Sequence, residues 1–464
     1  HITYTPAPDI IHEAAGHAPI IADDDYAEYL CSYGEIARKA IQSKQDSNQY
    51  EIIRKLSDMK EDPNTGPNDL KKIEKKFEEI FLENHWVSEA NELAKMNWWT
   101  IEYGLIGNLE NPKIYGAGLL SSVSESLDCL DSKVKKLPMS IDCIKQDYNI
   151  TEPQPQLFVT KNFKDLKNIL NEYSEKMAYK IGGKSGIEKA IKAESVTTSV
   201  FNSGLQVSGI IINYVNDSNG EIIYLNYDKN VQLSYNNTEI DGHGTNYHSE
   251  GYGAAIGILS DINLPIHKLS KRELFTLGIE EENQTTLKFS GGLIISGLIK
   301  NILELDGKPI LIRIENCSVM LNDNYLFKPE WGSYDLACGN KIISVFGGPA
   351  DWNNYYNSKS GPDSVTHQSS NIGQKNIKLN KLYIKVEKLK KNNSSNKNYM
   401  TVLNELYKYY PKEWLLCMNI YEIILGDESL NTEIEYLSNY IKTFTKNAAL
   451  EDIIKRGLQI IDKS

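Results

Sequence analysis

The sequence has no apolar run approaching the roughly 20 residues that a membrane-spanning helix needs, and no signal peptide opens it. It also has no surplus of basic residues, because 62 Asp and Glu outnumber 50 Lys and Arg and give a net charge of -12. Without that surplus, neither nucleic acid nor an anionic membrane is an expected partner. Six cysteines are scattered without a CxxC pair, which is typical of reduced thiols. Together these absences predict a cytoplasmic protein.

A length of 464 residues exceeds what one hydrophobic core usually serves. We expect an α+β multidomain protein, with a mainly helical core at 1–180, a β-rich domain at 195–350, a linker at 351–377 and a helical C-terminal region at 378–464. Within the first of these, residues 35–90 hold two charged segments with apolar residues at helical spacing. The segment EDPNTGP between them has the composition of a turn, so a helical hairpin is expected there. Farther along, QLFVT predicts a strand, and DLKNILNEYSEKMAYKI predicts a helix.

Two histidines, His12 and His17, are five residues apart in HEAAGH. On a regular α-helix this spacing separates them by roughly 140°, unlike the i, i+4 pair of a zinc protease. The rings converge on one metal only if the helix loosens near Gly16. The alternative is one capping histidine and one buried, hydrogen-bonded histidine.

Glu102 is the natural third ligand, because it lies in the apolar and aromatic stretch NWWTIEYGL, where an unpaired carboxylate is costly to bury. Two histidines and one carboxylate on one face of a metal suit Fe(II) that must also bind dioxygen. The alternative is an amphipathic helix with Glu102 facing water.

Three motifs, PDIIHEAAGHAP, WWTIEYGL and YGAGLLSSVSE, resemble in order and context the tetrahydropterin-dependent aromatic amino acid hydroxylase family. The likeness covers about residues 1–34 and 92–180. It implies that His12, His17 and Glu102 bind one iron and that Glu13 is a catalytic residue close to the pterin. The substrate-binding positions that it implies are Thr5, Pro6 and Pro8 on one side, and Trp98, Gly118, Ser121 and Glu125 on the other.

The resemblance further implies Fe(II), a tetrahydropterin such as tetrahydrobiopterin, and O2 as the co-substrate. The expected reaction is ring hydroxylation of an aromatic amino acid, with L-phenylalanine converted to L-tyrosine. The long hairpin at 35–90 and the β-rich domain are similar to a longer bacterial branch of the family. Because the family's catalytic domain begins upstream of TPAP, we expect the chain to be N-terminally incomplete. The upstream part supplies much of the pterin pocket and an arginine for the substrate carboxylate.

Two other functions stay open at this point. One is a zinc-dependent hydrolase that uses His12 and His17 with Glu13 as base, and the other is a catalytically inactive, hydroxylase-like scaffold or regulatory protein. A second histidine pair, His243 and His248, lies near Asp241 and Glu250 in DGHGTNYHSEGYG. A second metal site is conceivable there, but we expect a glycine-rich surface loop between strands. Assembly into a homo-oligomer is also left open.

Overall fold

The computed structural model describes residues 10, 12–61, 65–82, 86–148, 153–357, 374–391, 395–446 and 448–461. These residues form two compact units, His1–Pro362 and Asp363–Ser464, and each is described by itself. In the described parts, no helix has the length and apolar character needed to span a bilayer. The six cysteines are unpaired, and all except Cys31 are buried.

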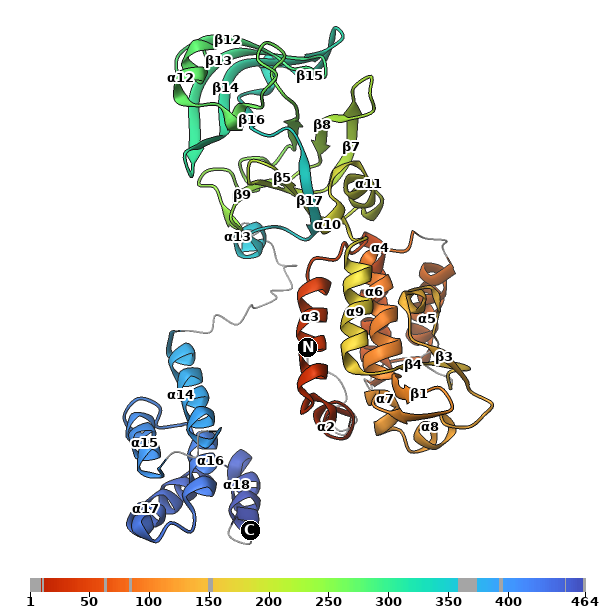
Figure 1. The fold of residues 1–464 in the computed structure, drawn as a ribbon, viewed down its shortest axis with the longest axis vertical. Coiled ribbons are helices and arrows are strands. Elements are labelled where there is room, and N and C mark those ends of the chain that lie inside the picture. Colours follow the sequence, from red (N-terminus) through yellow and green to blue (C-terminus); the bar gives the residue numbers. More distant parts are fainter. Residues whose placement is uncertain are drawn as a thin grey trace. The chain divides into compact units, whose positions relative to one another are not determined.

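The first unit begins with a series of helices (Figure 1). Buried aromatic side chains fill the core between them. In chain order they are η1 (His12–His17), α2 (Ala18–Ile21), α3 (Asp24–Ala37), α4 (Lys44–Glu61), α5 (Pro67–Leu82), α6 (Glu89–Asn97) and η2 (Trp98–Glu102). Asp23 caps α3 and Ser88 caps α6, each accepting a hydrogen bond from a backbone N–H of the first turn. The expected hairpin is confirmed, because α4 and α5 pack against each other.

A small sheet follows, with strand order β2-β1-β4-β3. Its strands are β1 (Leu105–Asn108), β2 (Asn111–Ile114), β3 (Lys135–Pro138) and β4 (Gln156–Thr160), so the strand expected from QLFVT is present. Four short or medium helices accompany it: α7 (Ala117–Ser121), α8 (Val123–Asp128), η3 (Ile141–Lys145) and α9 (Phe163–Ser174). The helix expected to run on to Ile181 ends at Ser174 and resumes as α10 (Ala178–Ile181). Helix α9 lies beside α3 (Figure 1).

The β-rich part consists of three sheets preceded by α10 and α11 (Gly183–Ala193). The first, ordered β10-β9-β6-β5-β17, contains β5 (Thr197–Phe201), β6 (Leu205–Gly209), β9 (Gln232–Tyr235), β10 (Thr238–Glu239) and β17 (Ile342–Gly347). The second, ordered β11-β8-β7, contains β7 (Ile211–Asn216), β8 (Ile222–Tyr227) and β11 (Tyr252–Ala255). The third, ordered β12-β13-β14-β15 with β16 also paired to β14, contains β12 (Gln284–Lys288), β13 (Leu293–Leu305), β14 (Lys308–Leu321), β15 (Asn324–Phe327) and β16 (Tyr334–Ala337). Three short helices complete this part: η4 (Ile266–Lys268), α12 (Lys271–Thr276) and η5 (Pro329–Trp331).

A buried carboxylate joins the helical and β-rich parts of the first unit. Glu89, only 2% exposed, accepts hydrogen bonds from Ile41 N at 3.2 Å, Ala178 N at 2.7 Å and Lys189 Nζ at 2.8 Å. Ile41 itself packs into the core of the β-rich part. The two parts therefore share both a polar anchor and apolar contacts.

The second unit is helical, as expected for residues 378–464. It comprises α14 (Gln374–Lys391), α15 (Lys397–Tyr409), α16 (Leu415–Ile424), η6 (Glu428–Leu430), α17 (Asn431–Lys442), η7 (Thr443–Lys446) and α18 (Ala448–Ile461) around one apolar core. In the segment expected to be a linker, residues 352–357 instead form α13 (Trp352–Asn357), because Tyr355 is buried. The rest of that segment up to residue 373 lies outside the described residues.

Candidate metal centre

His12 and His17 stand at the two ends of η1, which is a π-helix. In a π-helix each backbone N–H bonds to the carbonyl five residues earlier, so side chains five apart lie nearly above one another. Their Nε2 atoms are 3.1 Å apart, and the ring centroids are 4.8 Å apart. The wider π-helical winding of this segment, which includes Gly16, thus brings together two rings that a regular α-helix would hold roughly 140° apart.

Glu102 ends a second π-helix, η2, and completes the cluster. Its Oε2 lies 3.3 Å from His12 Nε2, and its Oε1 lies 3.5 Å from His17 Nε2. The three potential ligand atoms all lie within 4.8 Å of one another, and the three side chains are partly exposed. Two nitrogens and one oxygen arranged in this way fit a divalent first-row metal such as Fe(II), with coordination positions left for other ligands.

The Glu102 carboxylate also affects the protonation of His17. A hydrogen bond to Glu102 raises the pKa of His17 above its ordinary value, although partial burial acts in the opposite direction. A bound cation would replace that proton, since a ligating imidazole must present its lone pair.

Ser121 fixes the orientation of His12. Its Oγ lies 2.9 Å from His12 Nδ1 and donates its own proton to Ala117 O at 2.8 Å. Because the serine hydrogen is used in that way, Oγ accepts the N–H of His12 Nδ1, which leaves Nε2 unprotonated and directed at the cluster. Ser121, expected among the substrate-binding residues, therefore contacts a candidate ligand directly.

Close backbone approaches explain the glycines around the site. A Cβ atom on Gly16 would lie 2.7 Å from Ala117 O, and one on Gly116 would lie 2.4 Å from Glu102 O. A Cβ on Gly118 would meet the Tyr103 ring at 3.0 Å. These glycines let η1 pack tightly against α7, and let the start of α7 pack tightly against the segment that carries Glu102.

Trp98 lies between two tyrosine rings. It stacks on Tyr103 at 4.5 Å between centroids and on Tyr148 at 4.3 Å, with interplanar angles of 22° and 11°. Both faces of the indole are thereby covered, so a substrate ring can meet Trp98 only at its edge. Sequence reasoning missed both tyrosines. Tyr103 adjoins Glu102 in WWTIEYGL and could have been considered, whereas nothing marks Tyr148.

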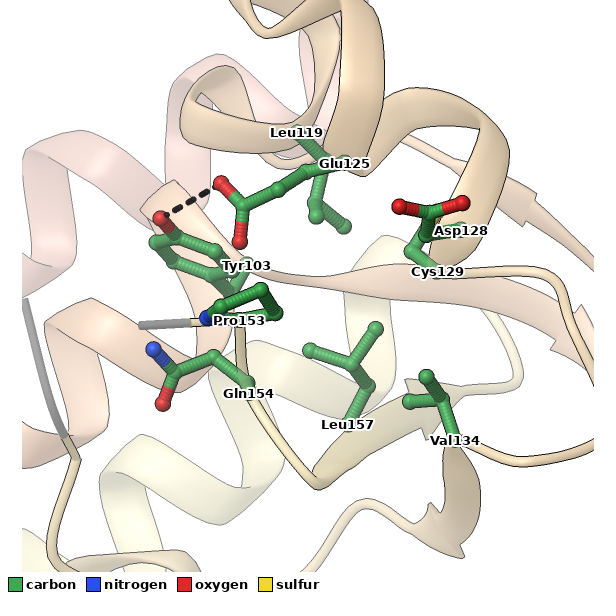
Figure 2. Close-up of a pocket in the computed structure, with 9 residues that line it drawn as sticks. All are labelled: Tyr103, Leu119, Glu125, Asp128, Cys129, Val134, Pro153, Gln154 and Leu157. Carbon is green, nitrogen blue, oxygen red and sulfur yellow. Dashed lines mark hydrogen bonds between the residues drawn. The ribbon is translucent and has the colours of Figure 1, made fainter. Parts of the chain in front are cut away.

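Glu125 points toward Tyr103 and accepts a hydrogen bond from its hydroxyl at 3.1 Å (Figure 2). Burial is the main cause that raises the pKa of Tyr103, and the nearby Glu125 adds to it. The small pocket beside this pair is also lined by Leu119, Cys129 and Leu157 and has a volume of about 20 Å³. That is room for about one water molecule, so these residues alone do not enclose an amino acid.

The remaining predicted site residues are placed as follows. Glu13 is exposed in η1, beside His12. Thr5, Pro6 and Pro8 lie outside the described residues.

The second histidine pair lies in the glycine-rich loop between strands that had been expected, but both imidazoles are buried. His243 and His248 are 8% and 7% exposed, and the carboxylate beside them belongs to Asp335 on β16 instead of Asp241 or Glu250. Burial lowers the pKa of His248 to about 3 and also lowers that of His243.

Comparison with known proteins gives the centre a family context. A family model described as biopterin-dependent aromatic amino acid hydroxylase matches residues 79–185. This segment is similar to the aromatic amino acid hydroxylase family. The matched hydroxylase segment includes Glu102, Ser121 and Glu125, while His12 and His17 precede it.

Individual hydroxylases match 35–37% of the chain. Phenylalanine-4-hydroxylase of Bos taurus is 31% identical over 172 residues, which are 37% of this chain and 28% of that protein. The Pseudomonas aeruginosa phenylalanine-4-hydroxylase is 26% identical over 172 residues, 37% of this chain and 48% of its own length. The chain thus spans less than half the length of these relatives. A crystal structure of Chromobacterium violaceum phenylalanine hydroxylase is 27% identical, covers 35% of this chain and 45% of its own, and has a TM-score of 0.22.

Proposed function

We propose that this protein is an iron- and tetrahydropterin-dependent monooxygenase that hydroxylates the ring of an aromatic amino acid, with L-phenylalanine converted to L-tyrosine. The observation that carries the proposal is the convergence of His12, His17 and Glu102 on one point, in a chain with a hydroxylase family segment. Phenylalanine is favoured because the Bos taurus and Pseudomonas aeruginosa relatives are phenylalanine-4-hydroxylases.

Neighbouring protein groups orient the three ligand side chains toward the metal. Ser121 selects the His12 tautomer that presents Nε2, and the two π-helices bring His17 and Glu102 to the same side. With all three ligands on one side, the opposite positions are free for small molecules. Bound Fe(II), together with the reduced pterin, would supply the activation of O2 for ring hydroxylation.

Three residues next to the metal ligands would position the substrate. Tyr103 holds the Glu125 carboxylate in one place by its hydrogen bond, so that Glu125 can accept hydrogen bonds from a substrate ammonium group. The edge of Trp98 offers an apolar contact for the substrate ring, and its two stacked neighbours keep it from moving. A substrate bound between these side chains and the metal would exclude water from the reacting atoms.

A hydroxylation assay tests the proposal. The purified protein is supplied with Fe(II), a tetrahydropterin and O2, and given phenylalanine, tyrosine or tryptophan in turn, while the hydroxylated product and pterin oxidation are measured. We expect tyrosine from phenylalanine, and no product from Glu102→Gln. If wild-type protein binds iron and hydroxylates none of the three, the catalytic claim is wrong and the scaffold alternative stands.

Metal analysis separates this proposal from the zinc hydrolase. Protein purified without added metal is examined for iron and zinc, and its oxygen uptake is followed with pterin present. The hydroxylase proposal would be contradicted if the protein holds zinc at His12 and His17 and shows no pterin-dependent oxygen uptake, even when Fe(II) has replaced the zinc.

A further inference from the structure

A second group of metal-binding side chains lies in the β-rich part, remote in sequence from the first. His243 Nδ1 is 3.3 Å from His248 Nε2 and 3.9 Å from Asp335 Oδ2, and one potential ligand atom from each residue lies within 4.8 Å of the others. Ligand atoms about 2.0–2.2 Å from a tetrahedral zinc ion lie roughly 3.3–3.6 Å from one another. The two measured separations are close to this geometry.

The backbone holds the two histidines rigidly. His243 O accepts a hydrogen bond from Leu233 N at 2.9 Å, and His248 O accepts one from Val231 N at 3.2 Å. Both bonds attach the loop that carries the histidines to the start of β9. The positions of the imidazoles are therefore set by the fold before any ion binds, which lowers the cost of assembling a site.

Hydrogen bonds also hold Asp335 in place. It faces Arg313 across the β14–β16 pair, and Arg313 Nε donates to its Oδ1 at 3.1 Å. The backbone carbonyl of Asp335 accepts the Tyr252 hydroxyl at 2.7 Å. Its other carboxylate oxygen, Oδ2, is the one nearest His243. The ring of Tyr247 lies against both imidazoles.

The buried carboxylate of this group keeps one oxygen for an ion. Asp335 is 3% exposed, and Arg313 pairs with its Oδ1. Its Oδ2, which lies beside His243, is the atom that can bind a cation.

Arg313 is the competing partner for this space. Its Nη2 lies 3.5 Å from His243 Nε2, at the long limit of a hydrogen bond. In that arrangement His243 Nε2 accepts from Arg313 and its Nδ1–H points to His248 Nε2. An ion on His243 Nδ1 moves the proton to Nε2, so the guanidinium must turn away from His243 while keeping Asp335. Losing one long hydrogen bond is a small cost beside three metal–ligand bonds.

We propose that His243, His248 and Asp335 form a second site for a divalent metal ion of the zinc class, which ties the loop between β10 and β11 to β16. Three protein ligands leave a fourth tetrahedral position for water. This proposal is independent of the activity at His12, His17 and Glu102.

The test is the number of cobalt or zinc ions that the whole chain binds after chelation and dialysis, measured by metal analysis and by the absorption of Co²⁺. Both centres take such ions, so wild-type protein is expected to bind about two equivalents. His248→Gln and Asp335→Asn should each keep about one, because loss of a ligand weakens the second site by more than the 10–100-fold that an outer-shell change costs. His267→Gln is the matched control, since His267 is a buried histidine of the same part and should leave both ions bound.

Two further measurements guard against misfolding. Circular dichroism of each variant without metal shows whether it folds, and a His17→Gln/Glu102→Gln protein removes the first centre while leaving the second intact. That double variant is expected to retain about one equivalent of Co²⁺. A double variant that binds no ion overturns the proposal, as does equal metal content in His248→Gln and His267→Gln.

Discussion

His12 Nδ1 lies 2.9 Å from Ser121 Oγ, although 109 positions separate the two residues in the sequence. The contact determines which imidazole nitrogen faces Glu102 and His17. A metal ligand that lacks such a partner can rotate or adopt the other tautomer, so the serine preorganises the centre. Ser121 had been expected to bind substrate, whereas the structure places its hydroxyl on a candidate metal ligand.

Removing that hydroxyl is expected to weaken the metal centre without unfolding the protein. Ser121→Ala should lower Fe(II) affinity by about 10–100-fold, because His12 loses the partner that orients it. Iron binding at equilibrium is the measurement, with Ser124→Ala, an exposed serine three residues on, as the control. Equal iron affinity in the two variants would show that Ser121 does not position His12.

Two glycines in helices should respond to alanine in opposite ways. Gly16→Ala places a Cβ 2.7 Å from Ala117 O, so η1 or α7 must shift, at a cost of about 1–3 kcal/mol in unfolding free energy and with weaker iron binding. Gly34→Ala in α3 has nothing within 4 Å of the new Cβ and should stabilise the protein by up to about 1 kcal/mol. Thermal or urea unfolding measures both. A gain in stability for Gly16→Ala would refute the close approach of η1 to α7.

The hydroxyl of Tyr103 should matter for the substrate more than for the metal. Tyr103→Phe keeps the stack on Trp98 but frees Glu125, and hydrogen bonds to charged groups contribute about 1.5–3 kcal/mol. We expect a KM for the amino acid raised by about tenfold or more, with unchanged iron content. Tyr148→Phe is the control, because Tyr148 also stacks on Trp98. If the two variants show the same KM, Glu125 does not depend on Tyr103.

The buried Glu89 is expected to be a major contributor to the stability of the first unit. Glu89→Ala leaves Ile41 N, Ala178 N and the Lys189 ammonium without their acceptor, and breaking a buried charge pair costs about 3–5 kcal/mol. Glu172→Ala removes only an exposed ion pair with Lys176 and should change stability by less than about 1 kcal/mol. Denaturant unfolding compares them, and similar midpoints would mean that Glu89 does not join the two parts.

Much of the local structure followed from the sequence, because it depends on short-range patterns. The hairpin of α4 and α5 and the strand β4 were predicted from apolar periodicity and turn residues, as was the β-rich character of residues 195–350. Two predictions from such patterns were wrong, in segments where tertiary packing determines the local structure. The helix expected to reach Ile181 is interrupted after Ser174, and residues 352–357 form a helix because Tyr355 is buried.

Which residues form the first cluster could be read from the sequence, because His12, His17 and Glu102 stand in two of the three ordered motifs. The sequence did not determine how residues five apart could meet, since that depends on π-helical winding, and π-helical hydrogen bonds leave no periodic signal in six residues. Tertiary structure alone decided the partners. It set Ser121 against His12 and Tyr103 against Glu125, and it brought Asp335 to His243 and His248 although Asp241 and Glu250 are nearer in the chain. Such contacts join distant segments, and their geometry arises only when strands and helices pack.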